Sequence, residues 1–96
     1  MISLEECRAA LDAVDREIVR LYEKRMTIVQ DVARYKMAKG LPVLDRSREE
    51  QVLDSRTAML QDPSRTESLR TLFECLMALS RAEQEAMLHA LKEAQP

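Results

Sequence analysis

The sequence predicts an all-α fold of three helices: a very long first helix, a short middle one and a long last one. Three observations support this. Among 96 residues there is one Gly and there are three Pro. An apolar residue recurs every seven positions near the N-terminus, and β-branched runs separated by turn residues are missing. These features favour helix throughout and exclude a β-sandwich or an alternating βαβ fold. A chain of this length builds one modest core, so we expect residues 1–96 to form a single domain.

The first helix is predicted over residues 4–39. Ser3 and Glu6 have the spacing of a capping box, in which each side chain satisfies a free backbone N–H group at the helix start. Gly40 suits the left-handed conformation that ends many helices, and Pro42 prevents the helix from resuming. No helix-breaking residue lies between these signals, so one unbroken helix is expected.

Two further helices are predicted after the first. The second begins at an N-cap residue, Asp45, and extends to about Leu60. The Asp-Pro-Ser segment of residues 62–64 then interrupts the chain, and a second capping box begins at Ser64. The third helix extends from there to about Lys92.

The length of the first helix predicts a second copy of the chain. A helix of roughly 35 residues is about 52 Å long. A compact globule of this chain length has a radius of gyration near 13 Å, so it is about 34 Å across. The apolar face of the helix therefore extends beyond any core that its own chain can build. We expect a homodimer in which the long helices lie beside each other.

Charged and polar residues interrupt the apolar faces of the first and third helices. Arg25 occupies a seam position that otherwise holds Leu4, Leu11, Ile18 and Val32. Lys36 follows eleven residues later, which is about 20° around a helix, so both cations face the same side. Arg8 points roughly 100° away from Arg25, so only an Arg8 from another copy of the helix is expected to reach the same ligand. In the third helix, Ser80 and Gln84 interrupt the apolar stripe.

Each of these residues also has a purely structural explanation. One polar residue in a helical seam often fixes register and oligomeric state, which would account for Arg25. Lys36 suits a helix end, and Ser80 and Gln84 suit the boundary of a core. Taken together, however, two buried cations on one face require an anionic partner. Arg48, in the positively polarised first turn of the second helix, also favours a negatively charged ligand.

Composition excludes several other functions. The formal net charge is −2, so no basic excess indicates nucleic-acid binding. No apolar run is long enough to cross a membrane, and no signal peptide precedes the first helix, so we expect a cytoplasmic protein. Cys7 and Cys75 lack the spacing of metal ligands, so no metal is expected.

The joint spacing of these residues resembles the all-helical chorismate mutase family. The resemblance extends from Arg8 to Gln84 and covers nearly the whole chain. Its pattern comprises Arg8, Asp15, Arg25, Lys36, Asp45-x-x-Arg48-Glu49, Leu72-Phe73 and Ser80-x-x-x-Gln84. Each short motif is weak by itself, but their combined spacing over three helices is fairly specific.

The resemblance implies an intertwined homodimer that converts chorismate to prephenate in phenylalanine and tyrosine biosynthesis, without a cofactor. It implies that Arg8 from the partner chain and Arg25 bind the two carboxylates of chorismate. Lys36 and Gln84 would hydrogen-bond the ether oxygen, so Arg25, Lys36 and Gln84 are the expected catalytic residues. The remaining implied binding residues are Glu49 at the ring hydroxyl, the Asp45 backbone nearby, Arg48, and Ser80 near the ring carboxylate.

Two alternatives remain open at this stage. An isochorismate-pyruvate lyase would have the same fold and similar residues, although an acid at position 49 favours the mutase. A helical dimerisation module without chemistry would use Arg25 only to fix register. Replacing Arg25 with Leu separates the enzyme from the module, because only the enzyme has an activity to lose.

Overall fold

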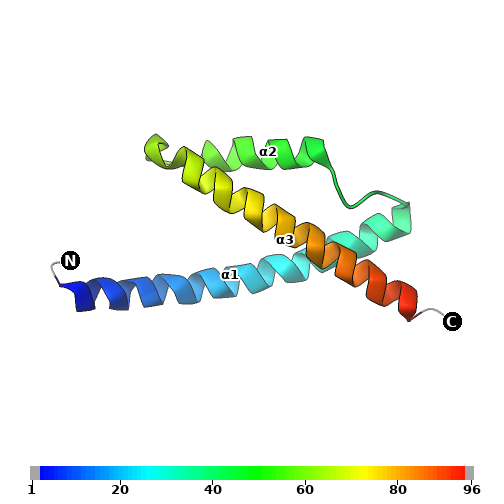
Figure 1. Ribbon diagram of the computed structural model, residues 1–96, viewed down its shortest axis with the longest axis horizontal. Helices are drawn as coiled ribbons and strands as arrows, with labels where there is room; N and C mark the ends of the chain where they lie inside the picture. Colours follow the sequence, from blue (N-terminus) through cyan, green and yellow to red (C-terminus); the bar gives the residue numbers. More distant parts are fainter. Residues whose placement is uncertain (1–2, 95–96) are drawn as a thin grey trace.

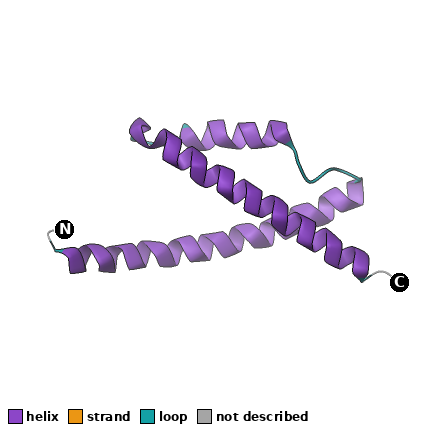
Figure 2. Cartoon of the chain, viewed as in Figure 1, coloured by secondary structure: helices purple, strands orange, loops and turns teal. Residues whose placement is uncertain are grey.

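The computed structural model describes residues 3–94 and contains three α-helices and one short 3-10 helix (Figure 1). In chain order they are α1 (Leu4–Lys39), α2 (Arg46–Thr57), η1 (Pro63–Arg65) and α3 (Thr66–Glu93). The described residues contain no strand (Figure 2). The predicted all-α fold with a long, a short and a long helix is confirmed.

Both ends of α1 form as predicted. The Ser3 Oγ accepts a hydrogen bond of 3.0 Å from the Glu6 backbone N–H. Gly40 has φ 66° and ψ 29°, which is the left-handed region that a side chain disfavours. Past it, the Leu41 N–H donates to the Lys36 carbonyl at 2.8 Å, as in a Schellman motif. These caps explain why a 36-residue helix begins and ends where it does.

The predicted end of the second helix at Leu60 is wrong, because α2 ends at Thr57. The Thr57 hydroxyl donates to the Leu53 carbonyl at 2.8 Å, inside the last turn. Beyond it, the N–H groups of Met59 and Leu60 bond to carbonyls three residues back, those of Arg56 and Thr57. Such bonds tighten the chain into 3-10 turns, so the α-helix does not continue.

The predicted cap at Ser64 is also wrong. Asp62 caps the chain instead: its Oδ1 accepts from the Ser64 N–H at 3.0 Å and from the Ser64 hydroxyl at 2.7 Å. These two bonds, with a third from the Arg65 side chain, lower the pKa of the Asp62 carboxyl below its ordinary value. Pro63 then starts the 3-10 turn η1, and α3 begins at Thr66. An Asp just before a Pro at the first helical position is the stronger start signal here.

The helices form an open arrangement in which α3 crosses α1 and also packs along α2 (Figure 1). Between α2 and α3 the core consists of Val52, Leu53 and Met77, with Phe73 packed against them. At the crossing with α3, the buried residues of α1 are Met26, Val29 and Ala33. α3 contributes two buried polar residues, Ser80 and Gln84. The crossing thus combines an apolar contact with polar side chains that face inward.

Much of the apolar face of α1 has no cover from its own chain. All of its buried residues lie from Met26 onward, whereas Leu11, Ile18 and Leu21 are each more than half exposed. The chain measures 61 × 27 × 14 Å and has a radius of gyration of 17.2 Å. That radius exceeds the roughly 12–13 Å of a compact globule of this length, as the sequence predicted for an overlong first helix.

Candidate active site

A cavity of about 180 Å³ lies where all three helices meet. Seven of the eight predicted site residues line it: Arg25, Lys36, Asp45, Arg48, Glu49, Ser80 and Gln84. Its other lining residues are Val29, Val32, Val43, Val52, Arg56, Met77 and Arg81. Five cationic and two anionic side chains therefore surround one small space, which suits an anionic ligand.

Helical periodicity explains how α1 and α3 supply this lining. Arg25, Val29, Val32 and Lys36 follow one another at intervals of four, three and four residues, which places them on one face of α1. The prediction that Arg25 and Lys36 share a side is confirmed by the cavity that both of them line. On α3, Met77, Ser80 and Gln84 have the same kind of spacing and are all buried.

Arg25 is fixed by α3 but is not neutralised by it. Its Nη1 donates to the Ser80 hydroxyl, which in turn donates to the Leu76 carbonyl at 2.7 Å. Burial, and then repulsion by Arg56, lowers the pKa of Arg25 from its ordinary value. Among the described residues no carboxylate forms an ion pair with Arg25. The guanidinium is therefore a positioned cation that still lacks a counter-ion.

Lys36 lines the cavity and holds the loop that joins α1 to α2. Its Nζ donates to the Val43 carbonyl at 2.7 Å. An ammonium group has three donor hydrogens, so this bond leaves capacity for a ligand. A carbonyl also leaves the positive charge uncompensated. The loop thus orients Lys36 without using up its charge.

Gln84 carries an unsatisfied polar atom. The residue is 6% exposed, and its Oε1 is buried without a hydrogen-bond partner in the described structure. Leaving a buried polar atom unpaired costs about 1–3 kcal/mol. A half-turn of the amide exchanges Oε1 with the donor Nε2, so either group can face the cavity. Buried polar atoms are rarely left without a partner, and a donor from a bound ligand or water is one way to supply the partner of Oε1.

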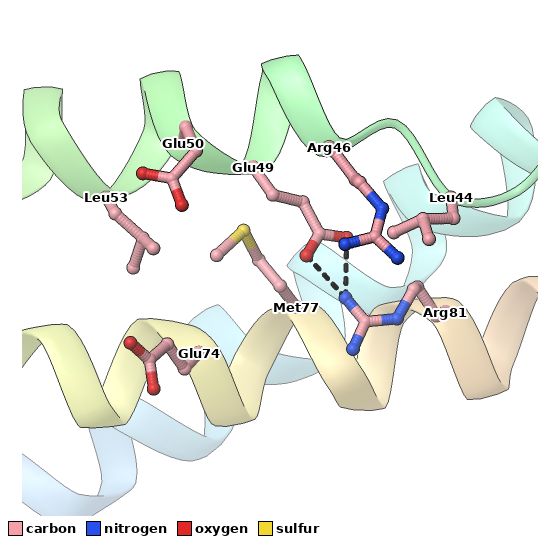
Figure 3. Close-up of a pocket in the computed structure, with 8 residues that line it drawn as sticks. All are labelled: Leu44, Arg46, Glu49, Glu50, Leu53, Glu74, Met77 and Arg81. Carbon is pink, nitrogen blue, oxygen red and sulfur yellow. Dashed lines mark hydrogen bonds and ion pairs between the residues drawn. The ribbon is translucent and has the colours of Figure 1, made fainter.

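The first turn of α2 supplies an acid to the cavity. Asp45 caps the helix by accepting from the Arg48 N–H at 3.0 Å, which orients the residues that follow. Glu49 is half-buried, and both of its carboxylate oxygens lie 2.5 Å from Arg81 Nη1, a nitrogen of α3 (Figure 3). Asp45 and Arg48 are exposed, and the Arg48 guanidinium donates to Gln51 Oε1 at 2.7 Å.

Two cationic residues of the lining were missed by the sequence prediction. Arg56 reaches the cavity from the last turn of α2, and Arg81 from the residue after Ser80. In the sequence each resembles ordinary surface charge, because the directions in which α2 and α3 cross are not encoded in the spacing. For Arg81, the one signal in the sequence that could have indicated a place in the lining was its position directly after Ser80.

Arg8 does not line the cavity in a single chain. It is exposed and lies seventeen residues before Arg25. At 1.5 Å per residue this places the two about 25 Å apart along the same straight helix. An Arg8 guanidinium can therefore reach the same cavity as Arg25 only if it comes from another chain.

A second, apolar groove adjoins the cavity. Its volume is about 640 Å³, and seven apolar or aromatic side chains line it: Ile18, Val19, Leu21, Tyr22, Leu72, Phe73 and Leu76. Arg25 and Arg56 line both the groove and the cavity. A molecule that covers the groove would therefore also come close to the guanidinium of Arg25.

Two kinds of feature are absent from the described residues. Within residues 3–94, no group of three or more His, Cys, Asp or Glu side chains has the arrangement needed to hold a metal ion. Over the same residues, none of the helices combines the length and the apolar character that crossing a bilayer requires.

Comparison with known proteins connects this geometry to a family. The sequence model of the family described as chorismate mutase type II matches residues 7–85. A chorismate mutase from Methanocaldococcus jannaschii is 28% identical over 86 residues, which cover 88% of this chain and 87% of that protein. The T-protein of Haemophilus influenzae is 36% identical over 56 residues. That match spans 58% of this chain but 15% of the T-protein.

A solved structure gives the same result for the fold. The chorismate mutase (form II) of Thermus thermophilus superimposes with a TM-score of 0.81 at 35% sequence identity. The match covers 85% of this chain and 93% of that one. The family resemblance and the fold class predicted from the sequence are both confirmed.

Proposed function

The chain belongs to the chorismate mutase type II family, and from this premise we propose how its residues convert chorismate into prephenate. The activity is that of an isomerase, and the reaction is a [3,3] rearrangement within one molecule. The observation that carries the proposal is the cavity where the three helices meet. There Arg25 and Lys36 face the same space, and no carboxylate of the described residues pairs with Arg25.

Arg25 binds a carboxylate of the substrate in this mechanism. A guanidinium can form two parallel hydrogen bonds with a carboxylate, which fixes orientation as well as position. Ser80 supports this role because its hydroxyl already accepts a hydrogen bond from Arg25 and is itself fixed to the α3 backbone. Holding the substrate in its reactive diaxial shape removes much of the entropic part of the barrier.

Lys36 and Gln84 act at the ether oxygen of the bond that breaks. Negative charge grows on this oxygen in the transition state, so a fixed cation beside it stabilises the transition state more than the ground state. The tether from Lys36 to the Val43 carbonyl holds the ammonium in place beforehand. The Gln84 amide donates to the ether oxygen through Nε2 in its flipped orientation, because Oε1, the atom without a partner, is itself an acceptor.

The remaining residues bind the other polar groups of the substrate. Glu49 accepts a hydrogen bond from the ring hydroxyl, with the Asp45 backbone nearby. Arg48 completes the polar lining. A million-fold acceleration needs about 8 kcal/mol of differential stabilisation. Charge-assisted hydrogen bonds of about 1.5–3 kcal/mol each can supply it if several strengthen in the transition state.

The active enzyme is a homodimer in this proposal, and each cavity is completed by Arg8 of the partner chain. Support comes from the uncovered apolar face of α1 and from the groove that adjoins the cavity. A partner helix lying in that groove would pass beside Arg25, which lines both spaces. We further propose that residues 1–96 act as one chorismate mutase domain in the cytoplasm.

The direct test offers the purified chain chorismate and isochorismate in separate reactions. Prephenate from chorismate supports the proposal, and sedimentation at several concentrations tests the dimer. Release of pyruvate from isochorismate with no prephenate from chorismate would establish the lyase instead. A folded chain that transforms neither compound would be a helical module without this chemistry.

A further inference from the structure

The ion pair between Glu49 and Arg81 is the most buried one in the described part of the chain. The Glu49 side chain is 25% exposed and that of Arg81 is 35% exposed, whereas every other charged partner is at least 39% exposed. One nitrogen of Arg81 contacts both carboxylate oxygens at 2.5 Å. The pair joins α2 to α3 directly (Figure 3).

The pair also lines two cavities. Glu49, Met77 and Arg81 line both the active-site cavity and a cavity of about 560 Å³ between α2 and α3. Figure 3 shows the Arg81 guanidinium reaching across this second space toward the Glu49 carboxylate. Arg46 also lines the second cavity but not the first. Arg81 is therefore the cation that contacts Glu49 at the wall of the active site.

A carboxylate in this position has two physical difficulties. Chorismate carries two negative charges, so an unpaired Glu49 would repel it. A free Glu side chain also occupies several rotamers, so it cannot present an acceptor oxygen in one place. A guanidinium nitrogen that contacts both oxygens addresses both difficulties. It neutralises the acid and restricts its orientation, while the remaining lone pairs stay available to accept a hydrogen bond.

We propose that Arg81 is a positioning residue that makes Glu49 selective for the ring hydroxyl of the substrate. This inference rests on the proposed function, because it uses the same cavity and the same substrate. Arg81 acts through Glu49: neutralising the acid favours any dianionic ligand, whereas orienting the acid favours only a ligand that carries the hydroxyl. The structure thus assigns a role to a residue that resembles surface charge in the sequence pattern.

The test compares two substrates, chorismate and its analogue that lacks the ring hydroxyl, in the full-length chain. The measured quantity is the discrimination ratio, which is kcat/KM for chorismate divided by kcat/KM for the analogue. Both compounds are dianions, so a general loss of positive charge or of stability lowers both values and cancels in the ratio. In Arg81→Met we expect the ratio to fall roughly tenfold, the effect of one lost well-placed hydrogen bond.

Glu49→Gln provides the second arm of the experiment. We expect the ratio to fall in this variant as well, and the double variant with Arg81→Met to show no further fall beyond about twofold, because both changes act on the same bond. Where Arg81→Met folds poorly, Arg81→Gln keeps a polar side chain at this partly exposed position. The ratio should then fall at least about threefold.

Arg70→Met is the matched control. Arg70 also connects α2 to α3, through Glu50 at 3.5 Å and Asp54 at 3.8 Å, but it does not line the active-site cavity. The discrimination ratio of Arg70→Met should equal that of the unmodified chain. An unchanged ratio in the Arg81 variants, or an equal fall in Arg70→Met, would overturn the inference. An unmodified chain that rearranges neither compound would refute the proposed function itself, which is a different result.

Discussion

Replacing Arg25 with Met removes the guanidinium at the centre of the proposed mechanism and keeps a side chain of similar length. Two charge-assisted hydrogen bonds to a substrate carboxylate are worth about 1.5–3 kcal/mol each. Their loss therefore raises the barrier by about 3–6 kcal/mol. That corresponds to a fall of roughly 10²- to 10⁴-fold in kcat/KM.

The stability of the chain should change little in the same variant. Arg25→Met removes the hydrogen bond to the Ser80 hydroxyl, worth about 1 kcal/mol. It also removes a cation that burial and the nearby Arg56 disfavour, as the lowered pKa of Arg25 indicates. These effects oppose each other, so we expect the free energy of unfolding to shift by no more than about 1 kcal/mol. In a domain of this size that is a few degrees in Tm.

The assay follows the loss of chorismate by ultraviolet absorbance, alongside thermal unfolding by circular dichroism. Arg34→Met is the matched control, because Arg34 lies on the same helix and bonds to Asp31 at 3.0 Å on the solvent side. Its kcat/KM should equal that of the unmodified chain. Retention of more than a tenth of the activity in Arg25→Met, or a Tm lower by more than about 10 °C, would refute the reasoning.

Three other predictions concern Gln84, Arg8 and Gly40. The unmodified enzyme should have a flat rate profile from about pH 5 to 9, because an amide donates a hydrogen bond at any of these pH values. Gln84→Glu should move activity toward acid, where the carboxyl is protonated and can donate. A bell-shaped profile in the unmodified enzyme would remove Gln84 from its role. Arg8→Ala and Arg25→Ala chains, each inactive alone, should regain about a quarter of full activity when mixed and reassembled. Half of the random dimers are then mixed, and one of the two sites in each mixed dimer is intact. Verified mixed dimers without activity would exclude a donated Arg8. Gly40→Ala should lower the free energy of unfolding by about 1 kcal/mol through the positive φ alone, since a Cβ there meets nothing within 4 Å. Urea titration measures this free energy, and an unchanged unfolding midpoint would contradict the prediction.

Local signals predicted the helix boundaries well where a single signal dominated. Ser3 and Gly40 are the strong capping residues at their ends of α1, and both cap as expected. Between α2 and α3, Asp62 and Ser64 both have capping side chains, and the choice depends on Pro63 between them. The capping-box spacing favours Ser64, whereas the structure uses Asp62.

The site could be predicted as far as helical periodicity reaches. Arg25 and Lys36 lie eleven residues apart on one helix, so their shared face follows from the sequence alone, and both line the cavity. Arg56 and Arg81 come from two different helices, and their convergence depends on how α2 and α3 pack. No spacing along the chain contains that information. Arg8 depends on a further chain, so its place in the site stays a prediction.

The thinness of the chain has a consequence for its folding. Its smallest dimension is 14 Å, which leaves room for no more than two layers of packed helices. None of the large side chains among the described residues is fully sequestered from water. A monomer would therefore expose little new apolar surface on unfolding. This implies a small m-value in denaturant titrations and a small heat-capacity change of unfolding. We expect cooperative melting to depend on dilution, with a midpoint that climbs as the protein is concentrated.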